Sequence, residues 1–257
     1  MLDYLRAECY KMLHRSYLWI ALLIVGGLEL VLVLLWAWLN GDAVNMTASA
    51  GFTMVLYLLS AGYYATAITS DIVFSDQYKC NTLKNEVACG LPRSRIYLGK
   101  LFASCLLSIG ACAVLLGWYA LLCALLLPGD GAALEALKVL GFALLCAFPV
   151  WLGSQAFYLL CFFSIRGNTA ATIVSVCIIA LFGQMLTFLS LLVSLPAPAL
   201  ADALLAVRGL LLTTPLENIT DAIWDWSRVG WAWAVGAGWC VGTTALGLWC
   251  FRRREIS

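Results

Sequence analysis

Few residues of this chain belong to types that perform chemistry, and none stands in a known catalytic pattern. The 257 residues include one histidine, His14, and eleven cysteines without a C-x-x-C pair. The sequence holds no Walker A phosphate loop, no H-E-x-x-H helix and no G-x-S-x-G nucleophile elbow. We therefore predict no catalytic residue, metal site or cofactor in this chain, and interpret the cysteines as small apolar packing residues.

One acidic residue, Glu29, lies near the middle of a long apolar run. A carboxylate in hydrocarbon costs at least about 2.5–3.5 kcal/mol on insertion scales, so this side chain must face protein or water. Glu29 could line a transport pathway or exchange a proton. It could equally make a contact between helices beside Gly26 and Gly27. The sequence leaves both interpretations open.

Polar residues form narrow stripes along two other apolar runs. At 100° per residue, the first stripe fills an arc of roughly 60° and comprises Thr53, Tyr57, Ser60, Tyr64 and Asp71. The second comprises Gly183, Thr187, Ser190 and Ser194, with Gln184 nearby. Such stripes suit a substrate pathway and close helix packing equally well. The candidate pathway residues are Glu29, Thr53, Tyr57, Ser60, Tyr64, Gln184 and Thr187.

The elements that carry these residues are predicted to be membrane-spanning helices. Hydrophobic residues make up 63 % of the chain and charged residues 11 %, whereas soluble proteins have about 45–50 % and about 25 %. The apolar residues form six blocks near the roughly 20 residues that cross a bilayer, at 17–39, 51–73, 101–127, 139–163, 169–193 and 230–250. Continuous runs of this length indicate helices instead of barrel strands. We predict an all-α polytopic fold, with 1–257 as a single transmembrane domain.

The basic residues predict the orientation of this bundle. Six crossings place both termini on one side, and with the N-terminus inside, 12 of the 15 Lys and Arg residues are cytoplasmic. Only Lys138, Arg208 and Arg228 then lie outside. We therefore expect a multi-pass protein of the plasma membrane with cytoplasmic termini. The net charge of +1 gives no reason to expect a nucleic-acid partner.

Three segments outside the spans have their own predicted structure. Residues 1–16 mix charged and apolar residues, as in an interfacial elbow helix. Residues 194–229 contain an apolar stretch, 199–213, that is too short to span and is bracketed by prolines. This composition predicts a re-entrant pair of short helices on the outer side.

The segment 74–100 is the largest predicted cytoplasmic connection. Leu83, Val87 and Leu91 recur at i, i+4 and i+8, which indicates a short amphipathic helix. Gly90 and Pro92 should end it. This pattern suits either the docking of a soluble partner or the anchoring of a loop to anionic lipid, and the periodicity does not separate the two.

The same segment carries an ordered set of polar and small residues. They are Asp76, Thr82, Leu83, Lys84, Asn85, Gly90, Ser94, Arg95, Gly99 and Lys100. This order resembles the loop between the second and third spans of type-2 ATP-binding cassette permeases, especially those of lantibiotic and bacitracin export or immunity. Asn81 stands where that family usually has glycine, and Pro92-Arg93 stands where it often has an apolar pair.

The resemblance implies a permease that pairs with a second copy or a paralogue and docks a separate ATPase subunit, which holds ATP and Mg. The docking residues that it implies are Asp76, Thr82, Leu83, Lys84, Asn85, Glu86, Val87, Gly90, Arg95 and Lys100. Together with the apolar, aromatic-rich spans, it favours an amphipathic peptide or another lipid-partitioning compound as the exported substrate.

Other classes of membrane protein remain open at this stage. A secondary transporter or channel that needs no ATPase would show internal repeats and paired intramembrane charges, of which only Glu29 is seen. A membrane-embedded enzyme would need His, Asp or Cys clusters near one bilayer surface, and the sequence shows none. A scaffold role leaves no signature in the sequence.

Overall fold

The computed structural model describes residues 2–40, 46–74, 82–165, 167–217 and 219–253, and all regular structure within them is helical. Six helical segments among these residues are long and apolar enough to cross a bilayer, so the predicted all-α fold with six spans is confirmed. The α-helices are α1 (Leu2–Leu13), α2 (Ser16–Leu39), α3 (Ala48–Leu58), α4 (Gly62–Phe74), α5 (Thr82–Ala88), α6 (Arg93–Leu126), α7 (Ala133–Ser164), α8 (Asn168–Val193), α9 (Pro198–Gly209) and α10 (Trp226–Arg253).

The second span is a broken helix, which the apolar pattern did not predict. A 3-10 turn, η1 (Leu59–Ala61), separates α3 from α4. The indole nitrogen of Trp151 on α7 donates a hydrogen bond to the carbonyl oxygen of Leu59 at 3.1 Å. The same carbonyl also accepts the backbone N–H of Gly62, so Trp151 gives it a second partner, from another helix of the bundle.

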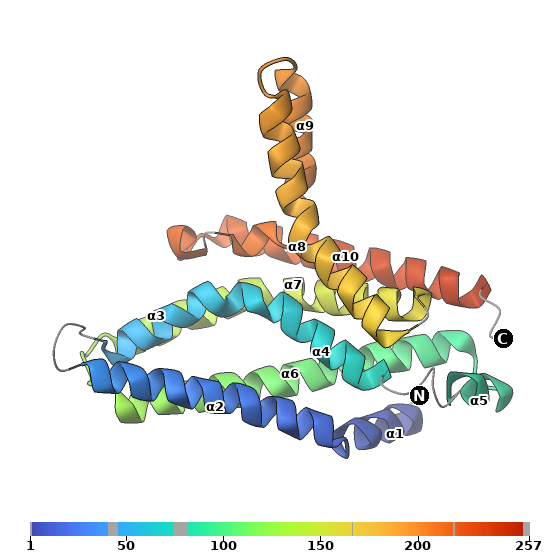
Figure 1. Ribbon diagram of the computed structural model, residues 1–257, viewed down its shortest axis with the longest axis horizontal. Helices are drawn as coiled ribbons and strands as arrows, with labels where there is room; N and C mark the ends of the chain where they lie inside the picture. The colour runs from blue at the N-terminus through green and yellow to red at the C-terminus, as the bar shows by residue number, and fades with distance from the viewer. Residues whose placement is uncertain (1, 41–45, 75–81, 166, 218, 254–257) are drawn as a thin grey trace.

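The helices α6 and α7 are longer than their apolar blocks. They contain 34 and 32 residues and begin at Arg93 and Ala133, whereas hydropathy placed their starts at 101 and 139. Helical hydrogen bonding continues past the hydrocarbon region wherever the sequence permits it, so an apolar run marks the membrane core and not the ends of a helix. Figure 1 shows α2, α3, α6, α7 and α10 running along the same long axis.

The closest packing in the bundle joins α7 to α10. Pro149 lies inside α7, and Gly236 of α10 lies against its carbonyl oxygen so tightly that a Cβ atom there would come within 2.3 Å. A glycine lets two backbones approach in this way, and small residues at helix contacts are typical of membrane bundles. The core therefore centres on α7, where Val150, Tyr158 and Phe162 are fully buried.

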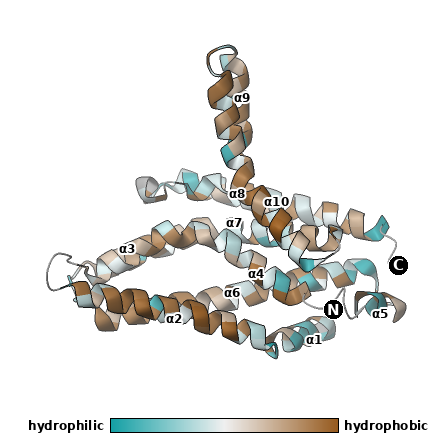
Figure 2. Cartoon of the chain, in the orientation of Figure 1, coloured by the Kyte–Doolittle hydropathy of each residue, from teal (hydrophilic) through white to brown (hydrophobic). Residues whose placement is uncertain are grey.

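A helical hairpin leaves the side of the bundle. In Figure 1, α8 diverges from the long axis and α9 returns beside it, and Figure 2 shows apolar residues along both helices. The predicted second short helix is absent from the described part of 210–225, which instead forms two 3-10 turns, η2 (Thr214–Leu216) and η3 (Ile219–Ala222). Pro215 lies in the first turn of η2, where its missing N–H group is tolerated.

One end of the bundle collects the elements that lie outside the spans. The helices α1 and α5 and the C-terminal end of α10 lie together there (Figure 1). We call this end the α5 end. The connection between α6 and α7 lies at the opposite end.

Candidate functional site

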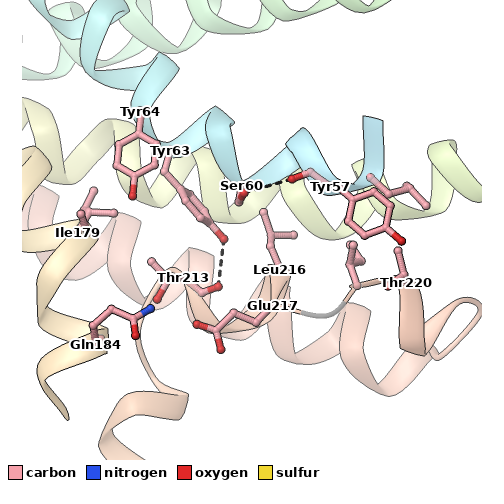
Figure 3. A pocket seen from close by; sticks show the side chains of 14 residues that line it. Tyr57, Ser60, Tyr63, Tyr64, Ile179, Gln184, Thr213, Leu216, Glu217 and Thr220 are labelled. Carbon is pink, nitrogen blue, oxygen red and sulfur yellow. Dashed lines mark hydrogen bonds between the residues drawn. The ribbon is translucent and has the colours of Figure 1, made fainter. Parts of the chain in front are cut away.

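A cavity of about 330 Å³ lies halfway along the second span. Its walls come from three places: the broken span, the middle of α8, and the chain that follows α9 (Figure 3). The residues that line it are Leu56, Tyr57, Ser60, Tyr63, Tyr64, Ile179, Ala180, Gly183, Gln184, Thr213, Leu216, Glu217, Ile219 and Thr220. Aromatic rings, hydroxyl groups and a carboxylate therefore share one site with aliphatic side chains, which suits an amphipathic ligand.

The helix break at η1 shapes one wall of this cavity. Ser60 lies in the 3-10 turn and donates a hydrogen bond to the carbonyl oxygen of Tyr57 at 3.5 Å. Tyr63 is buried, and its hydroxyl donates to the carbonyl oxygen of Thr213 at 3.2 Å (Figure 3). Tyr57 is 63 % exposed and Tyr64 is 39 % exposed. Tyr63 thus connects the second span to the segment that follows α9, whereas Tyr57 and Tyr64 leave part of their ring surface open to a ligand.

Charged side chains hold the opposite wall in place. Nη2 of Arg208 on α9 lies 2.6 Å from Oε2 of Glu217, and Nη1 of Arg228 on α10 donates to the backbone oxygen of Glu217 at 3.2 Å. The indole of Trp239 on α10 also donates to the carbonyl of Leu210 at 2.7 Å. Glu217 is therefore an anchor of this segment, and its carboxylate forms part of the cavity wall (Figure 3).

The structure brings together four of the seven candidate pathway residues, namely Tyr57, Ser60, Tyr64 and Gln184. Thr53 and Thr187 lie outside the cavity lining, and each hydroxyl donates at 3.0 Å to the carbonyl one turn earlier in its own helix, that of Ser49 or Gly183. Glu29 also lies outside the lining, on α2. Its Oε2 is buried and has no hydrogen-bond partner among the described residues.

The sequence did not predict a second set of polar residues inside the bundle, which surrounds Gln155. Gln155 of α7 is fully buried. Its Oε1 accepts hydrogen bonds from Thr69 at 2.9 Å and Ser108 at 2.7 Å, and its Nε2 donates to Ser70 at 2.6 Å. These contacts join α4, α6 and α7 without reaching the cavity, so the network serves helix packing.

The predicted docking segment forms the short helix α5. Its residues Lys84 and Asn85 are exposed, Thr82, Glu86 and Val87 are half-buried, and Leu83 is buried. Gly90 adopts a left-handed φ of 82° and its N–H donates to the carbonyl of Val87 at 3.0 Å, which ends the helix as the sequence indicated. Arg95 is exposed, whereas the side chain of Lys100 is fully buried. Asp76 lies outside the described residues.

Metal-binding groups do not gather anywhere in the part of the chain that the structure describes, since no three His, Cys, Asp or Glu side chains cluster there. The fold and the cavity define a polytopic α-helical membrane protein with an amphipathic site in the middle of its second span. The chain matches no model of a protein family, and no curated protein matches it significantly.

Proposed function

We propose that this chain is the permease subunit of an ATP-binding cassette exporter, powered by a separate ATPase subunit that binds ATP and Mg. The observation that carries the proposal is α5, a short helix outside the six spans at the end of the bundle that also holds α1. Leu83 buries one face of α5, while Lys84 and Asn85 present the other face to solvent. A rigid helix held in this way passes a push to the spans better than a flexible loop would.

The cavity supports an amphipathic peptide or another lipid-partitioning compound as the substrate. Its volume of about 330 Å³ lies at the lower end of the range for small-ligand sites, so it would hold one part of a larger molecule. Tyr57 and Tyr64 offer ring faces, and Ser60 and Gln184 offer hydrogen bonds. In this proposal a second permease copy or a paralogue completes the transporter, which lies in the plasma membrane with cytoplasmic termini.

Copurification tests the docking of the ATPase. The full chain would be coexpressed with an ATP-binding cassette ATPase encoded beside its gene. Lys84→Glu and Arg95→Glu should each reduce the ATPase recovered with the chain at least about fivefold, because both replace an exposed cation at the α5 end. Lys138→Glu is the matched control, since Lys138 is also exposed but lies near the start of α7, at the opposite end of the bundle. Unchanged recovery in both α5-end variants would refute the docking assignment.

Efflux of a lipid-partitioning dye tests the cavity. Cells that hold rhodamine 6G should lose it in an ATP-dependent manner when both subunits are present. Ser60→Leu and Tyr64→Leu should slow this loss, because each alters the cavity lining, whereas Thr187→Leu changes a hydroxyl outside the lining and should not. Efflux that continues without the ATPase and follows the proton gradient would favour the ATP-independent transporter instead.

A further inference from the structure

A cluster of charged residues is buried where α1, α5 and the first turns of α6 meet. The side chain of Lys100 on α6 is 0 % exposed, and its ammonium nitrogen lies 3.2 Å from Oε1 of Glu8 and 3.4 Å from Oε1 of Glu86. Glu8 belongs to α1 and Glu86 belongs to α5. One buried cation therefore holds two carboxylates that come from two separate helices.

Tyr4 completes the connection on the α1 side. Its hydroxyl donates a hydrogen bond to Oε2 of Glu86 at 3.0 Å, so α1 contacts α5 directly as well as through Lys100. Its ring lies so close to Gly99 that a Cβ atom at that position would come within 2.5 Å of ring carbons. This fit packs α1 closely against α6.

The electrostatics make the cluster interdependent. Burial alone would raise the pKa of Glu8, but Lys100 and Lys11 outweigh it and hold that pKa below its usual range. Burial lowers the pKa of Lys100, and Glu8 and Glu86 oppose that shift, so the ammonium group and the carboxylates depend on one another to stay charged. Removal of one member of a buried ion pair is costly because it leaves the other charge unpaired. Displacement of α5 would consequently pull on Lys100 and, through it, on α1.

We propose that α1 and α5 move as one rigid unit that Lys100 locks together as a positioning residue. Only two residues separate α1 from α2, and four separate α5 from α6. A displacement of α5 therefore reaches two spans, α6 directly and α2 by way of α1. The role of such a displacement in transport rests on the proposed function, in which the ATPase pushes α5. The lock between α1 and α5 does not depend on that function.

Hydrogen exchange of the purified full chain in nanodiscs of phosphatidylethanolamine and phosphatidylglycerol tests the lock reciprocally. Glu8→Gln, a change in α1, should raise exchange about tenfold in α5, and Glu86→Gln, a change in α5, should raise it about tenfold in α1. Glu135→Gln is the matched control, because its partner Lys138 is exposed at the other end of the bundle. Faster exchange confined to the helix that carries the substitution would overturn the lock.

Coupling is tested separately with the ATPase present. Glu8→Gln leaves Lys84 and Arg95 unchanged, so the copurified ATPase should remain, while ATP-driven efflux of rhodamine 6G should fall at least about fivefold. If hydrogen exchange shows that the lock is broken in this variant and efflux is still normal, then α1 has no role in passing the movement of α5 to the spans. If the unaltered chain binds no ATPase, the proposed function fails, and the exchange measurement still decides the lock.

Discussion

Individual polar residues in the spans fall into two groups that differ in what satisfies them. The hydroxyls of Thr53 and Thr187 bond to their own helices, and Gln155 bonds to side chains of two neighbouring helices. Tyr57 and Tyr64 instead keep part of their surface open in the cavity. The periodicity of a sequence shows that polar residues share a helix face, but it does not show which of them already have partners.

Gln155 should be worth more to stability than Gln184 of the cavity wall. Gln155→Leu removes three hydrogen bonds from a fully buried network, at an average of about 0.6 kcal/mol each inside a membrane. The expected loss of unfolding free energy is about 1–3 kcal/mol in detergent titrations. Gln184→Leu makes the same chemical change at an exposed position and should stay within about 0.5 kcal/mol of the unaltered protein. Equal losses would contradict this assignment.

The residues of the candidate site were only partly predictable, because periodicity shows which residues share a helix face but not which distant residues they contact. Tyr57, Ser60 and Tyr64 lie on one helix face in sequence and line one cavity in the structure. Tyr63 and Thr213 could not be paired from sequence, because their contact links positions 150 residues apart. The burial of Lys100 was missed likewise, since it depends on α1 folding back against α6.

At the scale of elements, the existence of the helices and the end of α5 at Gly90 were predictable, but the break in the second span was not. Apolar runs of about 20 residues dictate helices in a bilayer. At the break, the carbonyl of Leu59 accepts a hydrogen bond from Trp151 of another helix, and the starts of α6 and α7 lie in sequence that is not apolar. The sequence does predict a short helical stretch at 93–100 that leads into the third span, as the start of α6 confirms, but it carries no trace of the break.

The contact between α7 and α10 can be tested with two glycines of the same helix. Gly236→Ala would place a Cβ atom within 2.3 Å of the Pro149 carbonyl oxygen, so the helices must separate at a cost of about 1–3 kcal/mol. Gly238→Ala meets no atom within 4 Å and should leave stability unchanged or raise it by up to about 1 kcal/mol through helix propensity. Thermal unfolding of the purified protein measures both, and a reversed order would exclude this close approach.

At the scale of the whole molecule, the six spans bring both ends of the chain and α5 to one end of the bundle. The distribution of Lys and Arg predicts that this end is cytoplasmic. That prediction bears on every functional proposal above, because an ATPase and its ATP are found only on the cytoplasmic side. The orientation of the bundle can be measured without knowledge of any partner or substrate.

Labelling of Cys89 with a membrane-impermeant maleimide measures this orientation. Cys89 is a free, exposed thiol directly after α5, so inside-out vesicles should label it and intact cells should not, as peptide mass spectrometry would show. Gly129→Cys supplies the matched control in the α6–α7 connection, where an added Cβ atom meets no atom within 4 Å, and it should react from the cell exterior. Labelling of Cys89 from the exterior would place α5 out of reach of any ATPase, because a nucleotide-driven push can only arrive from the side that holds the nucleotide.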